Sequence, residues 1–84
     1  MRDQGDAQMI KGDVSTARLY YQVAAAGGDA DAALSLGNSY NPAFLAQLGV
    51  LGMRGDIAEA AEWYRRAQAL GSRDAERALQ TLSH

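Results

Sequence analysis

The 84-residue chain contains no cysteine, which excludes disulfide bonds, thiolate nucleophiles and thiolate-ligated metal sites. Because an oxidising compartment does not require cysteine, the compartment stays open between the cytoplasm, as the default, and the periplasm. Aromatic residues make up only 7% of the chain, and alanine supplies much of its 48% hydrophobic content. Small side chains let helices approach one another closely, so the composition favours tight helix–helix packing over a bulky core.

Long apolar runs and clusters of basic residues are also missing. No run approaches the roughly 20 residues that span a bilayer. The charges of Arg2, Asp3 and Asp6 exclude a signal peptide's apolar core from the first ten residues. The net charge is -2 at pH 7, and only Arg65 and Arg66 are adjacent basic residues. Since nucleic-acid surfaces need clustered Lys and Arg, we expect neither nucleic-acid binding nor direct membrane insertion.

What the chain has is a series of helix signals separated by glycines. One proline against nine glycines fits helices joined by tight turns. The clearest helix begins after Asp56, a capping residue type, and ends at Gly71, which can adopt the left-handed conformation. Between them, apolar residues recur at three- and four-residue steps and should share one inner face: Ile57, Ala60, Ala61, Tyr64 and Ala67.

Similar patterns predict helices over residues 2–11, 14–26, 30–39 and 75–82, with Asp13 and Asp29 as capping residues. Asn41 and Pro42 suit the start of one or two further helical turns over residues 43–48. No stretch alternates apolar and polar residues long enough to predict a strand. The predicted fold class is therefore all-α, with about five helices plus a short helical insertion.

The two halves of the chain repeat each other at an offset of 43 residues, with capping residues on capping residues and aromatics on aromatics. Tyr21 falls on Tyr64 and Leu36 on Leu79, and we expect all four to fill the spaces between adjacent helix pairs. Helix pairs that recur every 34 to 47 residues or so are typical of α-solenoids. Small residues are expected where the helices cross: Ala17, Ala24, Gly37, Ala60 and Ala67.

Residues 32–40 (AALSLGNSY) and 60–67 (AAEWYRRA), with Gly55-Asp56 between them, resemble a Sel-one-like repeat, a variant of the tetratricopeptide repeat with a longer loop. Residues 5–13 resemble the plain tetratricopeptide pattern. The resemblance implies antiparallel helix pairs stacked as a short right-handed α-solenoid. It divides the chain into a partial first pair (1–28), a second pair (29–71) with an insertion (41–54), and a capping helix (72–84). It also suggests a fragment of a larger bacterial protein.

The resemblance further implies a concave surface, lined by the first helix of each pair, that binds another protein or a peptide. This surface mixes polar residues with several acids, which suits a basic or polar peptide. The alternative, to which we give equal weight, is that this face is simply exposed to solvent and binds no partner. Carried over position by position, this surface comprises Asp6, Asp31, Leu34, Asn38, Asn41, Asp74, Arg77 and Thr81.

The insertion is strongly apolar, with Phe44, Leu45, Leu48, Val50 and Leu51. It either folds back on the second pair or leaves an apolar patch for a partner, to which Phe44, Leu45 and Leu48 would contribute. Folding back is favoured, because exposed runs this apolar are usually avoided.

Each candidate for chemistry has a simpler structural explanation. Ser35 and Ser39 have no histidine near in sequence to act as a base, and the one histidine, His84, ends the chain. The glycine-rich segment 49–55 lacks the preceding strand and the Lys-Ser/Thr pair of a phosphate loop. Trp63 falls on Tyr20 in the repeat, which favours packing over a binding platform. No catalytic residue, cofactor or metal is therefore expected.

Two functions follow from these observations. The first is a non-enzymatic interaction scaffold that binds a peptide or helix of another protein. The alternative is a self-assembly segment that forms a homodimer through its open first helix or the 41–54 insertion.

Overall fold

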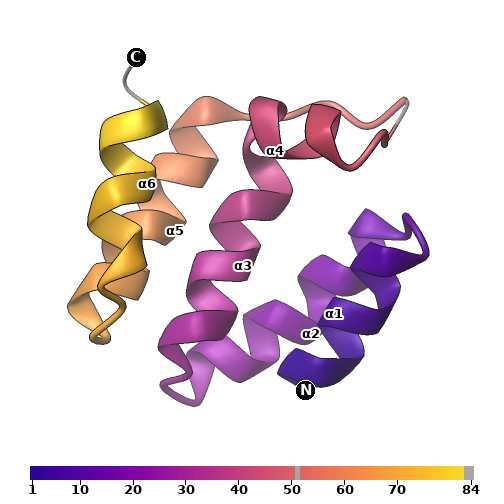
Figure 1. Ribbon diagram of the computed structural model, residues 1–84. Helices are drawn as coiled ribbons and strands as arrows, with labels where there is room; N and C mark the ends of the chain where they lie inside the picture. Colours follow the sequence, from indigo (N-terminus) through magenta and orange to yellow (C-terminus); the bar gives the residue numbers. More distant parts are fainter. Residues whose placement is uncertain (51, 83–84) are drawn as a thin grey trace.

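The computed structural model describes residues 1–50 and 52–82, which form six α-helices and no strand (Figure 1). The predicted all-α class and number of helices are confirmed for this part of the chain. Leu51 and His84 lie outside the described residues. The Cα atoms occupy a slab of 30 × 30 × 16 Å. The helices are α1 (Arg2–Ile10), α2 (Val14–Ala26), α3 (Ala30–Tyr40), α4 (Pro42–Gln47), α5 (Ile57–Ala69) and α6 (Asp74–Leu82).

The helices begin at the capping residues expected from the sequence. The side chains of Asp13, Asp29 and Asp56 each accept a hydrogen bond from the backbone N–H three residues later, at 3.1–3.2 Å. These bonds satisfy N–H groups that have no partner within the helix. At the opposite ends of α2 and α5, Gly28 and Gly71 have φ values of 95° and 108°, a conformation that glycine adopts without steric cost.

Neighbouring helices pack side by side in chain order. Figure 1 shows α1 antiparallel to α2, α3 antiparallel to α5, and α6 antiparallel to α5, while α2 also packs on α3. Small buried residues at the crossings permit this close approach: Ala17, Ala60 and Ala67 are fully buried. Ile57 differs from expectation because it is 58% exposed. It is the first residue of α5 and borders a surface hollow with Pro42 and Thr81.

Two tyrosines pack on glycines of the facing helix. A Cβ atom at Gly5 would lie 2.5 Å from the ring of Tyr21, and one at Gly37 would lie 2.5 Å from the ring of Tyr64. Both rings are buried. The expected position of these rings, between adjacent pairs, therefore needs correction: each ring lies within its own pair, α1 with α2 or α3 with α5. We call each arrangement a Tyr–Gly joint.

The connection from α3 to α5 resembles the connection from α1 to α2 but contains an additional segment, which we call the excursion. In the shorter connection the Asp13 N–H donates to the Gln8 carbonyl at 2.9 Å, and in the longer one the Asp56 N–H donates to the Tyr40 carbonyl at 2.7 Å. The second connection therefore starts and ends in the same way but holds eleven more residues. These form α4 and the loop after it.

The excursion folds back on the helices, as favoured from its sequence. Leu45 is 2% exposed, and Phe44 and Val50 pack partly buried against the core. Leu48 remains 47% exposed. Phe44, Leu45 and Val50 therefore contribute to the core and do not form an exposed apolar run.

Candidate functional site

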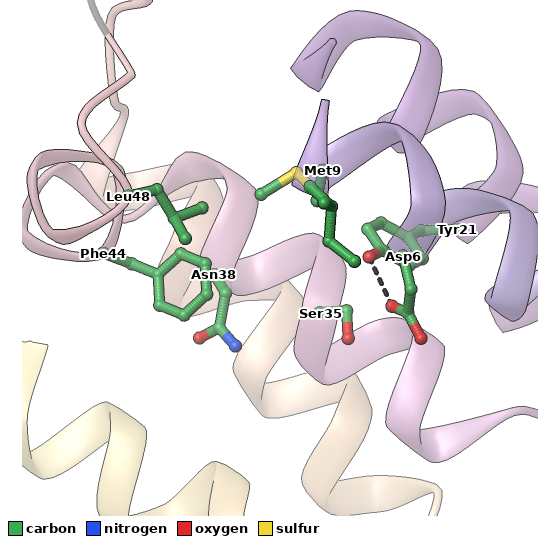
Figure 2. A pocket seen from close by; sticks show the side chains of 8 residues that line it. Asp6, Met9, Tyr21, Ser35, Asn38, Phe44 and Leu48 are labelled. Carbon is green, nitrogen blue, oxygen red and sulfur yellow. Dashed lines mark hydrogen bonds between the residues drawn. The ribbon is translucent and has the colours of Figure 1, made fainter. Parts of the chain in front are cut away.

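Two hollows that share Asn38 lie side by side on the described part of the chain, and we call the surface that contains them the hollowed face. The α1–α4 hollow lies between α1, α3 and α4 and has a volume of about 240 Å³; the α3–α6 hollow lies between α3, α5 and α6 and has a volume of about 430 Å³. The first is lined by Asp6, Met9, Ile10, Tyr21, Ser35, Asn38, Phe44 and Leu48 (Figure 2). The second is lined by Leu34, Asn38, Asn41, Tyr64, Asp74, Arg77, Ala78 and Thr81.

The structure brings together most residues of the expected concave surface. The α3–α6 hollow gathers six of the eight, because three- and four-residue steps place them on one face of α3 and one face of α6: Leu34, Asn38, Asn41, Asp74, Arg77 and Thr81. Asp6 lines the α1–α4 hollow. Asp31 lines neither hollow; its carboxylate accepts a hydrogen bond from Arg2 at 3.0 Å and is 71% exposed.

The three apolar candidates of the insertion have different positions. Phe44 and Leu48 line the α1–α4 hollow. Leu45 is 2% exposed, so its proposed contact with a partner is wrong. Its side chain belongs to the core, because α4 packs on α3 and turns this residue inward.

Buried tyrosine hydroxyls fix two acceptors on the hollowed face. The Tyr21 hydroxyl donates to Asp6 Oδ1 at 2.6 Å, and the Tyr64 hydroxyl donates to Asn38 Oδ1 at 2.6 Å. The Tyr64 hydroxyl also accepts from Asn41 Nδ2 at 3.1 Å. Burial raises the pKa of both tyrosines, and at Tyr21 the bond to Asp6 raises the pKa further. Both phenols therefore remain protonated donors at neutral pH.

Asp6 and Asn38 hold equivalent places in the two joints, since each follows the glycine on which a tyrosine packs. The sequence contains this signal as Gly5-Asp6 and Gly37-Asn38, which are separated by 32 residues. An alignment at an offset of 43, which matches the two tyrosines, does not match these two glycines. The eleven additional residues of the excursion lie between Gly37 and Tyr64, so the glycines repeat at a shorter distance than the tyrosines. Besides the two tyrosines, the lining residues that sequence reasoning missed are Met9, Ile10, Ser35 and Ala78.

Arg18 of α2 holds the end of α3, from which the insertion departs. Its Nη2 donates to the Ser39 carbonyl at 2.6 Å and its Nε donates to Ser39 Oγ at 3.2 Å. Its guanidinium carbon lies 3.8 Å from the centre of the Tyr40 ring. Ser39 is fully buried, and its hydroxyl donates to the Leu36 carbonyl at 2.6 Å. These contacts give Ser39 a structural role.

Within residues 1–50 and 52–82, no group of three Asp, Glu, His or Cys side chains is placed to hold a metal ion. None of the helices described is long and apolar enough to cross a membrane. Comparison with protein-family models, with curated proteins and with solved structures finds no match for this chain. Its function is therefore inferred from the residues of the hollowed face.

Proposed function

We propose that the chain is a non-enzymatic protein-interaction module of the Sel-one-like and tetratricopeptide type. In this proposal its stacked helix pairs form a short right-handed α-solenoid, and the hollowed face binds a segment of a partner protein. The observation that carries the proposal is that α1, α3 and α6 line two hollows that meet at Asn38. In the proposed solenoid these are the first helices of successive pairs. The repeated Tyr–Gly joints support the solenoid arrangement.

A polypeptide fits the chemistry of this face. Asn38, Asn41 and Thr81 offer side-chain amides and a hydroxyl, which suit the alternating donors and acceptors of a peptide backbone. Asp74 and Arg77 supply charges of both signs. Since the molecule measures 30 Å in its longer dimensions, an extended segment of at most about nine residues can cross it.

The proposal is tested by selecting short random peptides for binding to the chain and measuring their affinity for two charge-reversed variants. Arg77→Glu changes a residue of the α3–α6 hollow, and we expect it to weaken binding of the selected peptides at least about tenfold. The matched control Arg73→Glu makes the same change at an exposed residue that lines neither hollow, and should leave the affinity unchanged. Peptides that bind both variants equally well would count against the proposal.

Self-assembly is the second candidate, and one observation favours it. Ile10, 87% exposed, and Leu48, 47% exposed, lie at one end of the hollowed face and form an apolar surface there. Against it, the remaining exposed surface of α1 and of Lys11, which follows it, is mostly polar. It includes Asp3 and Gln4, and such residues resist burial in an interface.

The two candidates differ in the expected mass in solution. We expect light scattering after size exclusion to give the monomer mass of 8.9 kDa at both low and high protein concentration, on the order of 10 µM and 1 mM. A dimer that the Ile10→Ser variant abolishes would instead favour self-assembly through the end of α1.

A further inference from the structure

The α1–α4 hollow combines apolar walls with one charged group. Figure 2 shows Phe44 and Leu48 on one side and Asp6 with Tyr21 on the other, with Met9 between them. Among the described residues that line the hollow, Asp6 is the only one that carries a charge at neutral pH. An occupant of this hollow therefore meets apolar surface along most of its length and a carboxylate at one end.

The carboxylate of Asp6 has capacity for a further donor. Its Oδ1 accepts the hydrogen bond from Tyr21. In the described part of the chain no arginine or lysine forms an ion pair with it. An apolar occupant would remove water from Asp6 without returning a hydrogen bond, which is unfavourable. A cationic occupant would replace that water with a charge-assisted hydrogen bond.

From this geometry we propose that the α1–α4 hollow is a pocket for a long basic side chain, arginine in the first place, on the partner segment. The inference rests on the proposed function and names the chemistry of its partner. The aliphatic stem of the side chain packs on Met9, Phe44 and Leu48, and its guanidinium donates to Asp6. We choose a basic side chain as the occupant because its positive charge is opposite to the negative charge of Asp6.

Arginine is preferred over lysine because its planar guanidinium presents several N–H donors in a fixed geometry that matches a carboxylate. A glutamate at the same place in the partner would be repelled by Asp6.

The test is a titration of the isotope-labelled chain, followed by NMR, with four blocked tripeptides. Their central residue is arginine, lysine, methionine or glutamate between two alanines. We expect the arginine peptide to shift the amide signals of Asp6 and Phe44 and to bind more tightly than the lysine peptide. It should bind at least about fivefold more tightly than the methionine peptide, as one charge-assisted hydrogen bond implies. The glutamate peptide should cause no shift.

Two matched variants separate the role of Asp6 from a general effect of charge. Asp6→Asn keeps an acceptor for Tyr21 but removes the charge, and should weaken binding of the arginine peptide at least about fivefold while leaving the methionine peptide unaffected. Asp3→Asn removes the same charge from an exposed position of α1 outside the pocket, and should leave binding of every peptide unchanged.

Equal binding of the arginine and methionine peptides, or equal losses in the two variants, would overturn the inference. Shifts of the arginine peptide confined to the α3–α6 hollow would also overturn it, but would leave the proposed function standing. If none of the tripeptides, nor any peptide from the selection experiment, shifts signals in either hollow, both the inference and the proposed function fail.

Discussion

Replacing Gly37 by alanine is expected to lower the free energy of unfolding by about 2 kcal/mol. The new Cβ would lie 2.5–2.6 Å from two ring carbons of Tyr64, an overlap that costs about 3 kcal/mol in a packed interior. The better helix propensity of alanine returns up to about 1 kcal/mol. Tyr64 cannot move aside readily, because its hydroxyl is bonded to Asn38 and Asn41. Urea denaturation followed by circular dichroism measures the change.

The matched control is Gly27→Ala. Gly27 ends α2 with a φ of -84°, and the nearest atom to an added Cβ, the Ala24 carbonyl oxygen, lies at an ordinary 3.4 Å. This variant should be neutral or more stable by up to about 1 kcal/mol. If both variants lost the same stability, the Tyr–Gly joint would not be the cause.

Replacing Leu36 by alanine is expected to cost about 3 kcal/mol, within the usual range for a large-to-small change in a core. Leu36 is fully buried on α3, the helix that packs against both α2 and α5. Neighbours on both sides limit collapse of the cavity, so little of the loss is recovered. Since domains of this size have a total stability of only about 5–15 kcal/mol, thermal unfolding should show a large fall in Tm.

Leu19→Ala provides the comparison, because it makes the same chemical change on α2 where the side chain is 64% exposed. Its stability should change by no more than about 0.5 kcal/mol. A loss as large as that of Leu36→Ala would contradict the position of these two residues relative to the core.

Features that depend on local sequence could be predicted. Helix ends follow from Asp13, Asp29 and Asp56, which accept backbone hydrogen bonds within one turn, and from glycines such as Gly71 that can take positive φ. Six predicted surface residues lie together in the α3–α6 hollow because helical periodicity places them on one face of α3 and one face of α6. This could be predicted once the order of the helices was known. Whether these residues bind a partner stays a prediction.

Features that depend on contacts between distant residues could not be predicted. The packing of Tyr21 on Gly5 and the pairing of Arg2 with Asp31 join residues that no local pattern links. The burial of Leu45 depends on which face of a six-residue helix meets α3, and so short a helix has too few turns to show its apolar face reliably.

The hydrogen bond between the Asp56 N–H and the Tyr40 carbonyl, which closes the base of the excursion, has a consequence for how this chain can change. The segment between Tyr40 and Asp56 starts and ends at neighbouring positions, so it can be exchanged as a unit. We expect that a segment of another length can replace residues 42–55 if it keeps an apolar side chain in the place of the buried Leu45, because Asn41 then retains its hydrogen bond to Tyr64. Because Phe44 and Leu48 form one wall of the α1–α4 hollow, each such exchange would change the shape of that hollow and leave α1 and α3 around it in place.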